Sequence, residues 1–237
     1  MPGTAAKRVR QLDWKTLGES LDAHGHARTP RVLTPAECDS LVALYDDDRR
    51  FRSRIVMERL RFGVGEYKYF AAPLPPLVRS LRAALYPPLA RLANAWMEAL
   101  GEGERFPGTL DAFLRQCAAA GQTKPTPLML RYEVGGYNCL HQDLYGDVAF
   151  PLQVVAMLSR RERDYTGGEL LLVEQRPRAQ SAGEAIAAEQ GEMVVFPNRT
   201  RPVSGARGHY RVNVRHGISR VRSGRRYALG LIFHDAT

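Results

Sequence analysis

The chain has 237 residues, of which 44% are hydrophobic and 25% are charged, and its formal net charge is +9. Its length and composition are typical of a soluble globular protein with a full core, and no apolar run approaches the roughly 20 residues of a membrane-spanning helix. Cys38, Cys117 and Cys139 are too few and too widely spaced for a disulfide framework or a four-cysteine zinc site.

The chain begins with a polar segment, residues 1–30, that lacks the apolar middle part of a secretory signal. We therefore expect an N-terminal extension and a cytoplasmic protein. The sequence TPAE at residues 34–37 has the pattern of a capped helix start with proline in the first turn. It predicts a helix over residues 35–47.

Helical spacing continues through the rest of the front half. Leucines and a tryptophan recur at this spacing over residues 77–100, interrupted by Pro87 and Pro88. Because proline kinks or splits a helix, we expect two consecutive helices there. A further helix is predicted over residues 109–120, so residues 31–125 are expected to form a helical support region.

The back half consists of short β-rich runs separated by Gly and Pro. The predicted strands cover residues 128–133, 152–159, 168–174, 192–197, 210–216 and 226–234. We therefore expect a β domain over residues 126–237, integrated with the helical region into one catalytic unit.

Two histidines and an aspartate are candidate metal ligands. His141 and Asp143 flank a single glutamine, and His216 lies on the inward face of the strand at 210–216, because side chains alternate along a strand. Two histidines and one carboxylate hold ferrous iron on one face and leave the opposite face open for oxygen chemistry. His209 is the alternative third ligand, but only His216 is followed by an arginine ten residues later.

That arginine, Arg226, is a candidate for binding an anionic ligand. It shares a strand face with Ala228 and Gly230, whose small side chains leave space beside it. A buried guanidinium requires an anionic partner, and its planar fork suits a carboxylate. No acidic residue lies near it in the sequence, so we expect the carboxylate of a ligand.

Three other motifs are predicted to be structural, and a fourth is left open. His24 and His26 are expected in a solvated loop, His234 in a structural hydrogen bond, and Gly167-Gly168 in a turn rather than a phosphate cradle. Residues 65–70 (GEYKYF) interleave aromatic and basic side chains, which suits either a β-strand or a substrate lid near the metal. In either case two tyrosines of this segment would share one face.

Arginines gather in two segments, and such clusters attract polyanions such as nucleic acid. A solvated basic surface explains the clusters equally well. The first cluster is Arg49, Arg50, Arg52, Arg54, Arg59 and Arg61, and the second, between Met193 and His234, where no acidic residue occurs, is Arg199, Arg201, Arg207, Arg211, Arg215, Arg220, Arg222, Arg225 and Arg226.

Residues 126–237 resemble the iron(II)- and 2-oxoglutarate-dependent dioxygenases, on the evidence of the HQD at 141–143, His216 and Arg226. LRYEVGGYNCLHQD, with Tyr132 nine residues before the first histidine, resembles the AlkB-type nucleic-acid dealkylases. GGEL and HGISRVRSGRRYAL instead resemble the prolyl-4-hydroxylase type. The whole chain is similar to an uncharacterised bacterial family grouped with oxygenases of damaged DNA, through RFGVGEYKYF, TPLMLRY, HQDLYGD, EQRPR and LGLIFHDA.

The resemblance implies an α+β fold whose C-terminal half is a double-stranded β-helix (jelly-roll, cupin-like) behind a helical N-terminal layer. It implies that His141, Asp143 and His216 ligate Fe(II), that Arg226 binds the distal carboxylate of 2-oxoglutarate, and that Tyr132 assists there. O2 is the second cosubstrate, and ascorbate is a candidate stimulant. Arg225 is the neighbouring candidate cation, but alignment on the preceding glycine selects Arg226. The second aspartate of the AlkB type is absent, with Tyr145 in its place, so base selection is not transferred.

The favoured function is a dioxygenase that couples oxidative decarboxylation of 2-oxoglutarate to hydroxylation, with oxidative dealkylation of damaged nucleic acid as the outcome. The alternative is a protein hydroxylase of the prolyl type. A non-enzymatic binding module is a third hypothesis, disfavoured by the intact ligand set and Arg226. The expected partners are thus nucleic acid or a protein substrate and no membrane, and the sequence predicts no oligomeric state.

Overall fold

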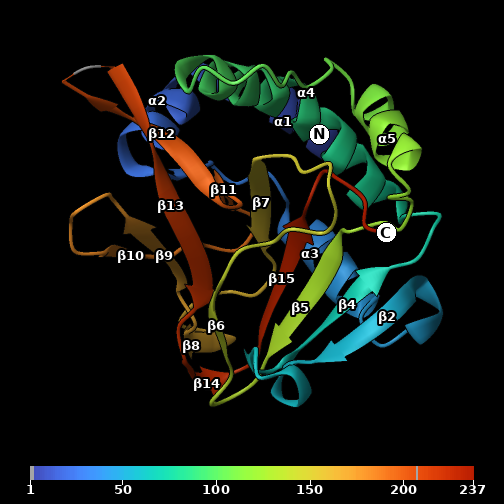
Figure 1. The fold of residues 1–237 in the computed structure, drawn as a ribbon. Coiled ribbons are helices and arrows are strands. Elements are labelled where there is room, and N and C mark those ends of the chain that lie inside the picture. The colour runs from blue at the N-terminus through green and yellow to red at the C-terminus, as the bar shows by residue number, and fades with distance from the viewer. Residues whose placement is uncertain (1–2, 207) are drawn as a thin grey trace.

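The computed structural model describes residues 3–206 and 208–237, so Arg207 of the second arginine cluster lies outside the described residues. Two antiparallel sheets form the body of the molecule, with helices across one end (Figure 1). The larger sheet has the strand order β1-β11-β7-β15-β5-β4-β2, and the smaller has the order β10-β9-β13-β6-β3, with β12 beside β13. Two further strands, β14 and β8, pair with each other.

Every described strand except β13 has six residues or fewer. The larger sheet contains β1 (Ala27–Arg28), β2 (Phe51–Val56), β4 (Glu66–Phe70), β5 (Leu128–Tyr132), β7 (Leu152–Met157), β11 (Met193–Pro197) and β15 (Arg226–Leu231). The other strands are β3 (Gly63–Val64), β6 (Tyr137–His141), β8 (Tyr165–Gly167), β9 (Leu170–Gln175), β10 (Ala182–Ile186), β12 (Thr200–Gly205), β13 (Gly208–Ile218) and β14 (Val221–Gly224). Each of the six predicted β-rich runs overlaps one of these strands.

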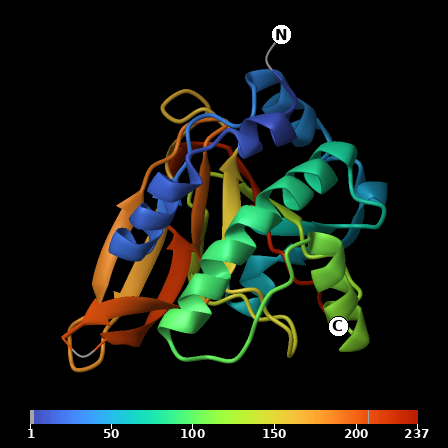
Figure 2. The ribbon, with the colours of Figure 1, turned by 90° about the horizontal axis from the view of Figure 1, so that it is seen from above.

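The helices cover the outer face of the larger sheet, as Figure 2 shows from above. They are α1 (Ala5–Arg10), α2 (Trp14–His24), α3 (Pro35–Ala43), α4 (Pro76–Ala99) and α5 (Leu110–Ala119), with short 3₁₀ turns η1 (Asp48–Arg50) and η2 (Met57–Leu60). The predicted start of α3 is confirmed: Glu37 N donates to Thr34 Oγ1 at 3.2 Å, and Thr34 N donates to the Glu37 carboxylate at 2.8 Å. The helix was expected to reach residue 47, but α3 ends at Ala43. The helix expected over residues 109–120 is α5, which Thr109 caps.

The prediction of two helices over residues 77–100 was wrong, because α4 runs unbroken through Pro87 and Pro88. The two prolines are adjacent, so the loss of their N–H donors is confined to one turn. The leucines on either side, including Leu81, Leu85 and Leu89, are fully buried in the main core. Packing against the sheet therefore holds the helix together where local propensity would break it.

The expectation that residues 31–125 are helical was wrong for residues 51–70, which form β2, β3 and β4. β4 pairs with β5 and β2 pairs with β4, so both extend the larger sheet, and β3 pairs with β6 of the smaller sheet. β1 of the N-terminal segment pairs with β11. The expected division of the chain at residues 30 and 125 stays a prediction. Residues 1–30 and residues 31–125 both supply strands to the sheets.

The core has two main parts, one on each face of the larger sheet. Leu229 and Leu231 of β15 pack with the helices, whereas Ala228 packs between the two sheets. This arrangement confirms the alternation expected for the last strand and directs Arg226 and Gly230 toward the space between the sheets. Within the described residues, no helix combines the length and the hydropathy needed to cross a bilayer.

Candidate active site

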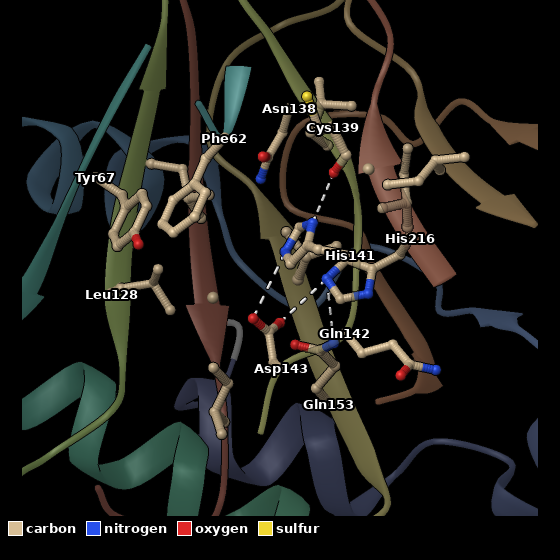
Figure 3. A pocket seen from close by; sticks show the side chains of 18 of the residues that line it. Phe62, Tyr67, Leu128, Asn138, Cys139, His141, Gln142, Asp143, Gln153 and His216 are labelled. Atoms are coloured by element: carbon tan, nitrogen blue, oxygen red, sulfur yellow. Dashed lines mark hydrogen bonds and ion pairs between the residues drawn. The ribbon is translucent and has the colours of Figure 1, made fainter. Parts of the chain in front are cut away.

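Sheet register places the two candidate histidine ligands side by side. His141 ends β6, His216 lies in β13, and these two residues are directly paired across the ladder, with ring centroids 4.2 Å apart. Asp143 follows His141 after one residue, in the segment that leaves the sheet. Figure 3 shows the three side chains pointing toward one another.

The three side chains form a compact set of donor atoms. Asp143 Oδ2 lies 3.1 Å from His216 Nε2, and Asp143 Oδ1 lies 3.5 Å from His141 Nε2. One donor atom from each residue lies within 4.8 Å of the others, a spacing that allows all three to hold one ion. Two imidazoles and one carboxylate are the donor set that suits a non-heme ferrous ion with open positions.

The protonation of these groups also suits a metal. His141 Nδ1 donates to the Cys139 carbonyl at 2.8 Å, which leaves the lone pair on Nε2 facing Asp143. Burial and the neighbouring His216 lower the pKa of His141, so its ring is neutral near pH 7. Burial alone would raise the pKa of Asp143, but the adjacent His216 and His141 hold that pKa below its usual range. The carboxylate is therefore ionised beside neutral His141.

The segment that carries Asp143 is anchored to β13 by Gln142. Its side-chain amide donates to the Val214 carbonyl at 2.9 Å and to the Arg199 carbonyl at 3.1 Å. The His216 ring is held from the other sheet, where Phe196 meets it edge-on with centroids 5.0 Å apart. The two hydrogen bonds of Gln142 and the packing of Phe196 on His216 join residues that are distant in the chain, so the local sequence pattern did not predict them.

A cavity of about 400 Å³ opens beside the triad. Its apolar lining comes mainly from both sheets: Leu128, Leu130, Val155, Leu170, Phe196, Ile218 and Ile232. Its polar lining, apart from the triad, includes Tyr67, Tyr132, Asn138, Tyr145 and Gln153. A cavity of this size and character is typical of a small-molecule site.

Arg226 is the most unusual charged residue in the structure. Its side chain is on β15, and the residue is only 1% exposed. Nε and Nη1 are buried and have no hydrogen-bond partner among the described residues, and Nη2 lies 3.4 Å from Met157 Sδ. The rings of Tyr132 and Tyr165 lie 5.6 Å and 6.0 Å from the guanidinium carbon. A buried cation without a carboxylate is costly, so this position fits the anionic ligand expected from the sequence.

Tyr132 links this cation to the cavity. It is the direct register partner of Arg226 on the adjacent strand, and it lines the cavity beside the triad. Its hydroxyl is fully buried and has no hydrogen-bond partner in the part of the chain that the structure describes, and burial raises its pKa, so the phenol remains protonated. The two residues thus present unpaired hydrogen-bond donors from neighbouring strands.

Gly168 packs closely against Arg226, although the sequence predicted only a turn at this position. Its φ of +65° is in the left-handed region, and a Cβ placed there would lie 2.8 Å from Arg226 Cδ. Gly167 ends β8 and Gly168 follows it, both with positive φ, and the second glycine makes room for the arginine. The GGEL motif contained this signal, because glycine is the residue that allows such a close approach.

The other histidines lie outside this site. His209 is exposed and lies 3.2 Å from the Ser204 hydroxyl, so the structure brings His216 rather than His209 to the other ligands. His26 lies 3.5 Å from Glu184 near the start of β1, and His24 ends α2. His234 accepts from Phe150 N at 3.1 Å, which confirms the structural hydrogen bond expected for it. The neighbouring candidate cation, Arg225, is exposed and pairs with Glu133 at 3.2 Å.

The segment at residues 65–70 is not a lid, because β4 is hydrogen-bonded on both sides within the larger sheet. Tyr67 lines the cavity and packs edge-on against Tyr69, which confirms that the two share one face. Lys68 points the other way and donates to the Tyr45 carbonyl at 2.8 Å and to Asp48 at 2.7 Å.

Comparison with known proteins gives a family and a fold. A family model described as "Oxygenase, catalysing oxidative methylation of damaged DNA" matches residues 65–236. Two uncharacterized proteins of Mycobacterium tuberculosis, from strains CDC 1551 / Oshkosh and ATCC 25618 / H37Rv, are each 55% identical over 167 residues, which are 70% of this chain and 72% of theirs.

Three solved structures share the arrangement of the whole chain at low identity. A Pseudomonas putida prolyl-4-hydroxylase is 15% identical, with a TM-score of 0.54 over 94% of this chain and 100% of that one. A 2OG-Fe(II) oxygenase family oxidoreductase from Burkholderia pseudomallei is 15% identical, with a TM-score of 0.55 over 100% and 95%. The non-heme alpha ketoglutarate dependent carbocyclase SnoK of nogalamycin biosynthesis is 17% identical, with a TM-score of 0.53 over 98% and 86%. The expected double-stranded β-helix fold is confirmed by these likenesses.

Proposed function

The chain belongs to the oxygenase family whose model it matches, and we propose that it is an Fe(II)- and 2-oxoglutarate-dependent dioxygenase that acts on damaged nucleic acid. The observation that carries the cofactor assignment is the pairing of a two-histidine, one-carboxylate set with a buried guanidinium, that of Arg226, whose Nε and Nη1 have no partner among the described residues. Iron and 2-oxoglutarate, when bound, would use O2 to convert a substrate C–H bond to C–OH, with succinate and carbon dioxide as the other products.

The triad, Tyr132 of the cavity lining and Arg226, which adjoins the cavity beside Tyr132, divide the binding of these groups. His141, Asp143 and His216 would hold Fe(II), and Arg226 would bind the distal carboxylate of 2-oxoglutarate through its unpaired nitrogens. The protonated phenol of Tyr132 would donate a hydrogen bond to the same ligand. The apolar walls of the cavity would keep bulk water from the reacting atoms.

A nucleic-acid substrate is supported by the family description and by the charge around the cavity. Arg59 and Arg61 are exposed and form no ion pair with a described residue, and Arg61 lines the cavity next to Phe62, which is 45% exposed. Cations draw phosphates to this side of the molecule, and an aromatic side chain offers a surface on which a base can stack. Hydroxylation of an N-methyl group on a base would give an unstable product that releases formaldehyde and restores the base.

Not all of the second arginine cluster supports this substrate. Arg201 and Arg226 are buried, and Arg211 and Arg225 pair with Glu102 and Glu133. The exposed members without an ion pair among the described residues are Arg199, Arg215, Arg220 and Arg222. The exposed basic surface in this cluster is therefore smaller than the number of arginines suggests, and Arg59 and Arg61 give the stronger support for a nucleic-acid substrate.

The second candidate is a protein hydroxylase of the prolyl type. It is favoured by the GGEL turn that packs against Arg226 and by the likeness to prolyl hydroxylases in fold. The same site chemistry on a prolyl ring would stop at a stable alcohol, with a mass gain of one oxygen atom.

The decisive experiment loads the protein with Fe(II) and 2-oxoglutarate without oxygen, admits O2, and measures succinate with methylated DNA, methylated RNA and peptide pools. Succinate and formaldehyde with a methylated oligonucleotide support the proposal, whereas oxygen incorporation into a peptide supports the hydroxylase. His141→Ala is the control, and it should lose iron binding and succinate formation together. No turnover of 2-oxoglutarate by the iron-loaded protein with any pool would leave a binding module as the better description.

A further inference from the structure

Tyr145 contacts a candidate iron ligand directly. It lies two residues after Asp143, and its hydroxyl donates to Asp143 Oδ1 at 2.7 Å. The other carboxylate oxygen, Oδ2, lies 3.1 Å from His216 Nε2. Oδ1 also lies 3.5 Å from His141 Nε2, but among the described residues only Oδ1 accepts the hydrogen bond of the phenol, so the two oxygens of Asp143 are not equivalent.

We propose that Tyr145 is a positioning residue, which holds one oxygen of Asp143 so that only the other coordinates the metal. This inference rests on the proposed metal site but not on the nucleic-acid substrate. A carboxylate can bind a metal through one or both oxygens. A hydrogen bond to Oδ1 occupies the lone pair that chelation would use, and it leaves a coordination position free for the cosubstrates.

The local backbone explains why such a positioning residue is needed. β6 ends at His141, so Asp143 has no strand partner to fix its orientation. The segment is tied at its start by Gln142 and at its far end by Gln122, which donates to the Val148 carbonyl at 2.9 Å and accepts from Val148 N at 2.8 Å. Between these ties, the hydroxyl of Tyr145 contacts the carboxylate in addition to the two histidine ligands.

The phenol of Tyr145 is itself held by ring packing. Its ring meets Tyr69 of β4 edge-on, with centroids 6.2 Å apart, and lies 5.8 Å from the ring of His234. Tyr69 packs edge-on against Tyr67, and His234 is fixed by its hydrogen bond to Phe150 N. The rigid larger sheet thus orients the hydroxyl, and the hydroxyl orients the ligand.

The test uses Tyr145→Phe in the full-length chain, with cobalt(II) alone as the probe. Removal of a group that orients a metal ligand typically lowers metal affinity by about 10- to 100-fold. We expect a loss of this size in cobalt(II) affinity and a changed visible absorption spectrum, because the second carboxylate oxygen can then enter the coordination sphere. Tyr137→Phe is the matched control: it deletes a hydroxyl from the strand that carries His141, outside the cavity, and should bind cobalt(II) as the wild type does.

Unchanged cobalt(II) affinity and an unchanged spectrum in Tyr145→Phe would overturn the inference. So would a lower melting temperature of the metal-free variant with metal affinity intact, since that result describes a packing role only. If Tyr145→Phe does not fold, Tyr145→Met removes the same hydroxyl with a more adaptable side chain, and the same loss is expected. A wild-type chain that binds no cobalt(II) would refute the metal site and this inference together, whereas failure on every nucleic-acid substrate would affect only the proposed function.

Discussion

Replacing Arg226 by methionine should stabilise the ligand-free protein while abolishing its use of 2-oxoglutarate. Two buried nitrogens of Arg226, Nε and Nη1, lack a partner. Each unpaired buried donor costs about 1–3 kcal/mol. The contacts of the guanidinium with the rings of Tyr132 and Tyr165 offset about 0.5–2 kcal/mol of that cost. The two donors together cost about 2–6 kcal/mol, so after this offset the free energy of unfolding should rise by up to about 5 kcal/mol in Arg226→Met.

The matched control is Arg201→Met, because Arg201 is equally buried, at 2% exposed, but is fully paired. It donates to Glu174 at 2.7 Å and to the Asp22 carbonyl at 2.8 Å. Its replacement should lower the free energy of unfolding, since it leaves Glu174 with one partner fewer. Denaturant unfolding of both metal-free variants gives the comparison, and a chain of this length should shift its melting temperature by about 2–4 °C per kcal/mol. A loss of stability in Arg226→Met as large as that in Arg201→Met would refute the idea that Arg226 awaits a ligand.

Three further predictions concern other parts of the site and its surroundings. Gly168→Ala should raise the KM for 2-oxoglutarate at least tenfold, because the added Cβ would lie 2.8 Å from Cδ of Arg226. The control is Gly103→Ala, which has nothing within 4 Å of its Cβ and should leave the KM unchanged. Equal effects of the two substitutions would contradict the steric argument. Burial lowers the pKa of His234 to about 4 from 6.5, so the stability it contributes is full above pH 6.5 and is lost as the pH falls toward 4. His234→Gln should therefore reduce the pH dependence of unfolding in that window by up to about 3 kcal/mol, and an unchanged slope would count against a neutral buried ring. Replacing both Arg59 and Arg61 by alanine should weaken binding of single-stranded oligonucleotides and reduce the salt slope by about 0.7 per lost phosphate contact, whereas an unaltered slope would place the nucleic acid elsewhere.

Much of the candidate site could be predicted from local pattern. Alternation along residues 210–216 placed His216 on the buried face, and the small residues after Arg226 indicated space beside its side chain. The cap at Thr34 and the helix after Thr109 were also readable, because capping and amphipathic spacing act within a few residues. These features depend on neighbours in the chain, so the sequence alone determined them.

Other features depend on residues that are distant in the chain. Pro87 and Pro88 stay within α4 because the sheet packs against the leucines around them, and residues 66–70 become an inner strand because β5 and β2 lie on either side. The contact between Tyr145 and Asp143 depends on where the ring of Tyr69 lies. Propensity has a weak influence at such positions, and tertiary packing overrides it.

The sequence by itself determined which side chains can bind a metal and a carboxylate, and toward which face of its strand each one points. Only the tertiary structure decided that His216 pairs with His141 and that no acidic residue within residues 3–206 and 208–237 pairs with Arg226. The physical reason is that side-chain direction is set by the two-residue repeat of a single strand, whereas register and pairing are set by the free energy of contacts between strands far apart in the chain.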